Sequence, residues 1–90
     1  MKMLNLEVIS NSMKIQGFEM EPTSKTVIGT EIIEGSMETQ NGILTVLVGS
    51  NGTMDVYKPN GKMKRSMPAT TSKAIAQIKQ TVRYNNNQGW

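Results

Sequence analysis

The sequence predicts an α+β fold, an antiparallel β-meander of about five to six strands with one C-terminal amphipathic helix. The main observation is that three Asn-Gly pairs, at positions 41–42, 51–52 and 60–61, separate short β-rich runs. Asn-Gly favours the positive φ angles of a type I′ hairpin turn. Apolar residues then recur at helical spacing from about residue 71 to residue 84. We therefore expect one domain at residues 1–84 and a flexible polar tail at residues 85–90.

The first twenty residues predict two strands. In Met3–Ile9 the apolar side chains alternate with polar ones, which is typical of a half-buried strand. A turn at residues 11–12 leads to a second strand over Met13–Met20. Gly17 interrupts this strand and indicates a bulge or the close approach of another backbone.

The segment Thr26–Thr39 follows a loop around Pro22 and allows two interpretations. Ser24 could cap a helix that runs through this segment. However, Gly29 weakens a helix, and Val, Ile and Thr dominate the composition. We therefore expect one long, bent strand.

Three further strands are expected around the Asn-Gly turns. Ile43–Val48 is apolar on nearly every position, which favours a central strand. Thr53–Lys58 and Lys62–Met67 alternate polar and apolar residues. The last of these carries charge and precedes Pro68, as expected of a protected edge strand.

The C-terminal helix should begin after a hydroxyl cap at Thr70, Thr71 or Ser72. Ile75, Ile78 and Val82 then form one apolar stripe. The residues expected on the opposite, polar side are Lys73, Gln77, Gln80 and Tyr84.

Charge is divided sharply along the chain, although the net charge is only +3. Residues 1–55 hold three lysines and seven carboxylates, a net charge of −4, whereas residues 56–90 hold seven cations and no acid. This asymmetry indicates an anionic partner for the C-terminal part. It also allows the basic part of one chain to meet the acidic part of another copy or of an acidic protein partner. A solvated basic face is the plain alternative.

The composition excludes several functions. The chain has no Cys and no His, so it lacks disulfides, thiolate nucleophiles, a serine triad and the usual zinc ligands. Ser66 or Ser72 beside Lys64 or Lys73 leaves a Ser–Lys pair formally open, but we expect no enzyme, no cofactor and no metal site. No signal peptide or spanning segment is recognisable, which predicts a cytoplasmic protein without membrane contact.

The one stretch that suggests a binding site joins the basic last hairpin to the start of the helix. A helix start offers unpaired N–H groups and the positive end of the dipole, which suit an anion. Arg65 is expected on the half-buried side for bidentate contact, and Lys62 and Lys64 as general attraction. The candidate ligand-binding residues are Tyr57, Lys62, Lys64, Arg65, Thr70, Thr71, Ser72, Lys73 and Tyr84, the two tyrosines as stacking platforms for a base.

Two functions follow from these features. The first is a small non-catalytic binding protein for a phosphate-bearing ligand, either a nucleic acid or a small nucleotide. The second is a protein-interaction module, such as a small inhibitor or a homo-oligomeric assembly subunit. The size, the missing Cys and His and the compact hairpins are similar in style to small phage-encoded proteins. The stretch can also be purely structural, with Thr70–Ser72 only capping the helix.

Overall fold

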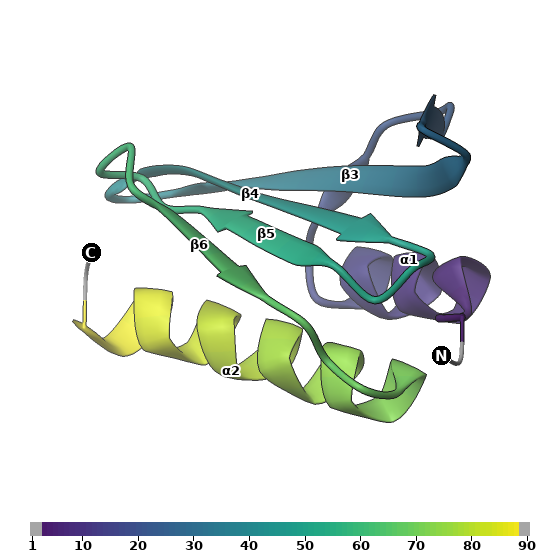
Figure 1. Ribbon diagram of the computed structural model, residues 1–90. Coiled ribbons are helices and arrows are strands. Elements are labelled where there is room, and N and C mark those ends of the chain that lie inside the picture. The colour runs from purple at the N-terminus through teal and green to yellow at the C-terminus, as the bar shows by residue number, and fades with distance from the viewer. Residues whose placement is uncertain (1–2, 89–90) are drawn as a thin grey trace.

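Six antiparallel strands and two helices make up residues 3–88, the part of the chain that the computed structural model describes (Figure 1). The strands lie in the order β1-β3-β4-β5-β6, and β2 pairs with the same edge of β3 as β1 does. Both helices cover one face of the sheet (Figure 1). The α+β class is therefore confirmed, with a second helix that was not predicted. The elements in chain order are α1 (Leu6–Ile15), β1 (Glu19–Met20), β2 (Lys25–Val27), β3 (Thr30–Thr39), β4 (Gly42–Gly49), β5 (Met54–Tyr57), β6 (Met63–Ser66) and α2 (Thr71–Gln88).

All three Asn-Gly pairs lie in hairpin turns, as predicted, but the predicted type I′ geometry is wrong. Gly42, Gly52 and Gly61 have positive φ, whereas the preceding asparagines do not. At two of these hairpins the glycine N–H instead closes a four-residue turn, with Gly52 bonding Gly49 O at 3.0 Å and Gly61 bonding Lys58 O at 2.9 Å. These are the bonds of type I turns that end in a positive-φ glycine, another common hairpin connection.

Helix α1 replaces the predicted strand over Met3–Ile9. The side chain of Asn5 accepts a hydrogen bond from the Val8 N–H at 3.2 Å and so caps the helix. Leu6, Ile9 and Met13 are buried, while Val8 is 45% exposed. The apparent period of two at Leu6 and Val8 was therefore accidental, because the buried set follows the helical spacing of three and four residues.

The second predicted strand, Met13–Met20, is mostly the end of α1. Gly17, at φ +104°, terminates the helix, with its N–H bonding Lys14 O at 3.0 Å and the Phe18 N–H bonding Met13 O at 2.9 Å. This pair of bonds defines a Schellman cap, in which glycine relieves the strain of the left-handed position. Gly17 is thus a helix terminator rather than a bulge, and only Glu19–Met20 remains as strand.

The segment Thr26–Thr39 is β-structure, not helix, but it forms a hairpin of β2 and β3 rather than one bent strand. Its turn consists of Ile28 and Gly29, at φ +47° and +74°. Positive φ at both central residues is the type I′ arrangement, where Asn, Asp or Gly is preferred. Ile28 is the one non-glycine residue with positive φ among residues 3–88. A left-handed L-residue costs about 1–2 kcal/mol, and branching at Cβ makes the position less favourable still.

Strand β4 is central, as predicted, because it pairs with β3 over eight residues and with β5 over four. Leu44, Val46 and Val48 point toward the helices and are fully buried. Met13 and Met54 are also almost completely buried, in agreement with the adaptable shape of methionine in a small core. The buried hydrophobic core comprises Leu4, Leu6, Ile9, Met13, Phe18, Leu44, Val46, Val48, Met54, Val56, Ala74 and Ile78.

Helix α2 extends to Gln88, beyond the predicted end near residue 84. Ala74, Ile78 and Asn85 lie on its buried stripe, and the Asn85 side chain is 1% exposed although its Oδ1 has no hydrogen-bond partner. Burial of this position continues the helix into the segment predicted as a flexible tail, of which residues 89–90 lie outside the described part. Of the helices in residues 3–88, neither combines the length and apolar character needed to cross a membrane.

Replacing Ile78 by Ala should lower the free energy of unfolding by about 2–4 kcal/mol, because the side chain is fully buried and its loss leaves a cavity. The matched substitution Ile15→Ala should change it by less than ~0.5 kcal/mol, since Ile15 is 87% exposed. Urea unfolding followed by circular dichroism measures both values. Equal losses for the two variants would contradict the assignment of the core.

Candidate functional site

The sheet order turns the charge division of the sequence into a division in space. The carboxylates other than Asp55 belong to α1, β1, β3 and the segments beside them, at one edge of the sheet. The cations of residues 56–88 lie on the β5–β6 hairpin and on α2, at the opposite edge. Asp55 on β5 forms an ion pair with Arg65 at 2.8 Å. The β6–α2 side of the molecule is therefore cationic.

A groove of about 550 Å³ lies on this cationic side, between the last two strands and α2. The buried side chains of Met54 and Val56 form part of its apolar wall. One hydrogen bond crosses from β6 to α2, from Ser66 Oγ to Gln77 Oε1 at 3.0 Å. No carboxylate is present among the lining residues, which are Met54, Val56, Lys58, Lys64, Ser66, Gln77, Gln80, Thr81 and Tyr84.

Strand register and helical spacing bring the polar lining together. Lys64 lies opposite Val56 in the β5–β6 ladder, so it points to the helix-facing side of the sheet. Gln77, Gln80 and Tyr84 are three and four residues apart on α2 and share one face. The groove is thus formed where the edge strand and one face of the helix meet.

The chemistry of this groove suits a ligand with an anionic and a flat part. Lys58 and Lys64 supply ammonium groups, which carry positive charge and hydrogen-bond donors. The Tyr84 side chain is 48% exposed at the groove and presents an aromatic surface. Gln77 and Gln80 add amides with both donor and acceptor atoms. Among residues 3–88 there is no group of three or more His, Cys, Asp or Glu side chains that could hold a metal ion.

The predicted hydroxyl residues at the start of α2 make structural contacts instead of lining the groove. Thr70 Oγ1 accepts a hydrogen bond from the Lys73 N–H at 3.1 Å, as a helix cap does. Thr71 Oγ1 accepts one from the Asn5 N–H at 3.0 Å and thereby connects the starts of the two helices. Ser72 and Lys73 are exposed on the first turn and do not line the groove.

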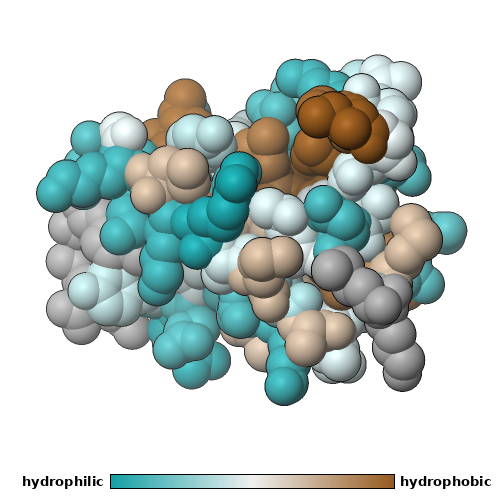
Figure 2. Space-filling model, viewed as in Figure 1, coloured by the Kyte–Doolittle hydropathy of each residue, from teal (hydrophilic) through white to brown (hydrophobic). Residues whose placement is uncertain are grey.

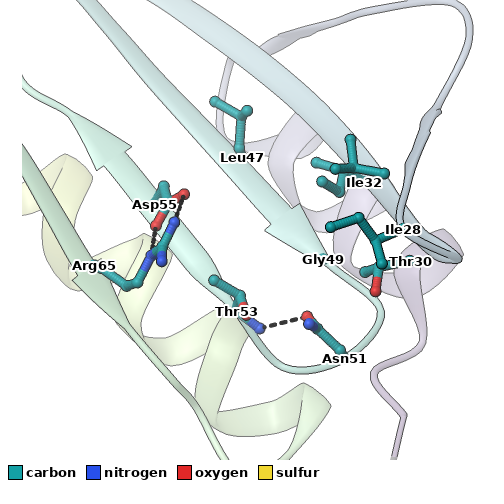
Figure 3. Close-up of a pocket in the computed structure, with 10 residues that line it drawn as sticks. Ile28, Thr30, Ile32, Leu47, Gly49, Asn51, Thr53, Asp55 and Arg65 are labelled. Carbon is teal, nitrogen blue, oxygen red and sulfur yellow. Dashed lines mark hydrogen bonds and ion pairs between the residues drawn. The ribbon is translucent and has the colours of Figure 1, made fainter.

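Arg65 and Tyr57 lie on the other face of the sheet. Arg65 stands opposite Asp55, and its guanidinium donates two hydrogen bonds to that carboxylate, at 2.8 and 3.1 Å (Figure 3). These hydrogen bonds, together with the negative charge of Asp55, raise the pKa of Arg65 above its usual value. Tyr57 lies opposite Met63, two pairs farther along the same ladder and therefore on the same face. A carboxylate of its own chain therefore holds Arg65 in place, but the Arg65 side chain is 62% exposed, so the expected half-buried position is wrong.

The predicted residues consequently occupy separate places. Lys64 and Tyr84 meet in the groove, Thr70–Lys73 surround the start of α2, and Tyr57 and Arg65 lie on the face without helices. Lys62 lies in the β5–β6 turn, where its N–H bonds Asn60 Oδ1 at 3.0 Å. The sequence prediction did not include Lys58 among the binding residues. Its position just before the predicted turn at 60–61 nevertheless indicated that it belongs to the basic hairpin.

Comparisons with protein-family models, with curated proteins and with solved structures find no match for this chain. Function is therefore inferred from the geometry and charge of the described residues.

Replacing Thr71 by Val should lower the free energy of unfolding by about 0.5–1.5 kcal/mol, because it removes the hydrogen bond between the helix starts. Thr71→Ser keeps the hydroxyl and should stay close to the wild type. Neither variant should weaken ligand binding, since Thr71 does not line the groove. Urea unfolding and a binding titration measure the two effects. If Thr71→Val lost ligand affinity without losing stability, Thr71 would belong to the binding site after all.

Proposed function

We propose that the protein is a small non-catalytic binding protein for a phosphate-bearing ligand, either a nucleic acid or a small nucleotide, which it holds in the groove between β6 and α2. The single observation that supports this function is the meeting of Lys58 and Lys64 with Tyr84 in a groove lined by no carboxylate. The volume of about 550 Å³ falls within the usual range for small-molecule sites.

The two lysines are the proposed phosphate contacts. A phosphate near Lys58 and Lys64 meets two positive charges and no neighbouring negative charge from the lining residues. Lys62, in the turn between them, adds attraction without a defined contact. The helix start contributes little to this site, because none of the residues from Thr70 to Lys73 lines the groove.

Tyr84 is the proposed platform for a base. Base stacking on an exposed aromatic ring accepts every base, because each base has a π-face. The amide groups of Gln77 and Gln80 lie along the same helix face and can contact the edge of a stacked base. A ligand with both phosphate and base therefore uses the groove more fully than inorganic phosphate does.

The double substitution Lys58→Ala with Lys64→Ala should raise the dissociation constant for a fluorescein-labelled single-stranded oligonucleotide by at least about tenfold. It should also flatten the dependence of affinity on salt concentration, by roughly one unit of slope for each lysine that no longer neutralises a phosphate. Fluorescence anisotropy at several salt concentrations measures both. The control, Lys14→Ala on α1, removes an exposed lysine of the other helix and should have little effect.

A second pair of variants separates the base from the phosphate. Tyr84→Ala should cost about 1–3 kcal/mol of affinity for a ligand with a base and almost nothing for inorganic pyrophosphate. Arg65→Ala should leave affinity for both ligands unchanged, because Arg65 lies on the other face and pairs with Asp55. Calorimetric titration against ATP and pyrophosphate makes this comparison. The proposal fails if the lysine double variant binds oligonucleotide, ATP and pyrophosphate as the wild type does.

A further inference from the structure

One face of the sheet has no helix against it and is rich in exposed apolar side chains. The helices cover the other face, and the most hydrophobic surface in Figure 2 lies along the upper side of the molecule, away from them. By strand register, Ile43 and Leu47 on β4 and Ile32 on β3 point to this uncovered face. Its most exposed apolar side chains, with the turn residue that borders it, are Val27, Ile28, Ile43, Tyr57 and Met63.

A hollow of about 400 Å³ lies at the β2–β3 end of this face (Figure 3). Ile28, Ile32 and Leu47 contribute apolar surface on one side. The Arg65–Asp55 ion pair forms the opposite side (Figure 3). The hollow therefore combines an apolar wall with a pair of charges that neutralise each other.

Neither the exposure nor the backbone conformation of Ile28, which borders this hollow, stabilises a single copy of the chain. Its side chain is 100% exposed, so it gains no burial within the chain. Its backbone lies at φ +47°, a conformation unfavourable for a β-branched residue. Strained residues that gain nothing from their own fold are typical of functional positions.

We propose that the hollow and the β2–β3 turn form the contact surface for a second copy of this chain, with Ile28 of each copy inserted against the apolar wall of the other. A two-fold axis brings the same patch of both copies together, so the patch must complement itself. This patch does so, because it contains both a projecting apolar side chain and an apolar hollow.

The charges favour a second copy at this place. Around the hollow, Arg65 pairs with Asp55 and Lys25 pairs with Glu34, so two facing copies meet without net repulsion. Two further carboxylates point to the same face, Glu19 opposite Ser36 and Glu38 on β3. They lie roughly 13 and 20 Å from Ile32 along the strand, and neither lines the hollow. The cationic β6–α2 side, in contrast, repels its own copy. Because Arg65 and Lys25, the cations around the hollow, are both paired with carboxylates, the hollow attracts a nucleic acid only weakly.

The size of the face fits a dimer of moderate affinity. Only β3 and β4 are long, and the other strands have two to four residues, so the strand residues cover roughly 500 Å² of this face before side chains are counted. A standard protein interface buries about 800 Å² per partner. A chain of 90 residues with one covered sheet face also gains stability from an oligomer more than a larger domain does.

Ile28→Asn tests the proposal cleanly, because Asn before Gly29 is the preferred sequence for this turn. The substitution removes the apolar anchor while it relieves the backbone strain, so the monomer should keep or raise its melting temperature. Sedimentation equilibrium should show the wild type approaching twice the chain mass as concentration rises through the micromolar range. The dimer dissociation constant of Ile28→Asn should be at least about tenfold higher. The matched control, Ile15→Asn, changes an exposed isoleucine on α1 and should leave it unchanged.

Salt separates this surface from the proposed ligand groove. The dimer should persist at about 500 mM NaCl, because its interface is apolar and its ion pairs are internal, whereas phosphate binding should weaken strongly. A wild type that stays monomeric at about 1 mM, or a dimer that Ile28→Asn does not weaken, would overturn the proposal, since an apolar anchor in a hot-spot position must matter to affinity. If high salt abolished the association, the two copies would instead meet through the acidic edge of one and the basic edge of the other.

Discussion

The long pairing of β3 with β4 is the constraint on which the rest of the molecule depends. Eight consecutive residue pairs, from Ile32 with Gly49 to Thr39 with Gly42, fix which side chains face the helices. A shift of one residue would move Leu44, Val46 and Val48 from the core to solvent. The same register directs Ile43 and Leu47 to the other face. The buried core and the exposed apolar face are therefore two consequences of one pairing.

The hairpin half of the fold could be predicted from the sequence because its signals are local. Asn-Gly marks a turn whichever turn type forms, so the strands were located correctly although the φ angles were not. The N-terminal half depends on contacts that are distant in sequence. Leu6, Ile9 and Met13 form a helical stripe only because the sheet and α2 are there to cover it. In a short run, Leu6 and Val8 fit a strand equally well, and tertiary packing decided between the two periods.

The candidate site was predictable in charge but not in geometry. The acid-free C-terminal segment located the cationic side, and two predicted residues, Lys64 and Tyr84, do line its groove. Arg65 follows Lys64 directly, and alternation places neighbours of a strand on opposite faces. The decisive partner, Asp55, is ten residues away and meets Arg65 only through the register of β5 and β6. Sequence alone could show that Arg65 and Asp55 were both present, but not that each neutralises the other.

The Arg65–Asp55 pair also explains how two proposed surfaces can work in one small sheet. Without Asp55, Arg65 would extend the positive field of the β6–α2 side to the uncovered face, and two copies would repel each other there. The carboxylate removes that charge at the sheet itself, so the cationic field is confined to the side of the groove. One copy can then contact another through the uncovered face while both grooves remain on the outer, helix-covered sides. A dimer of this kind presents two cationic grooves. A ligand that is bound in one groove and is long enough to reach the second then meets that second groove at a raised effective concentration.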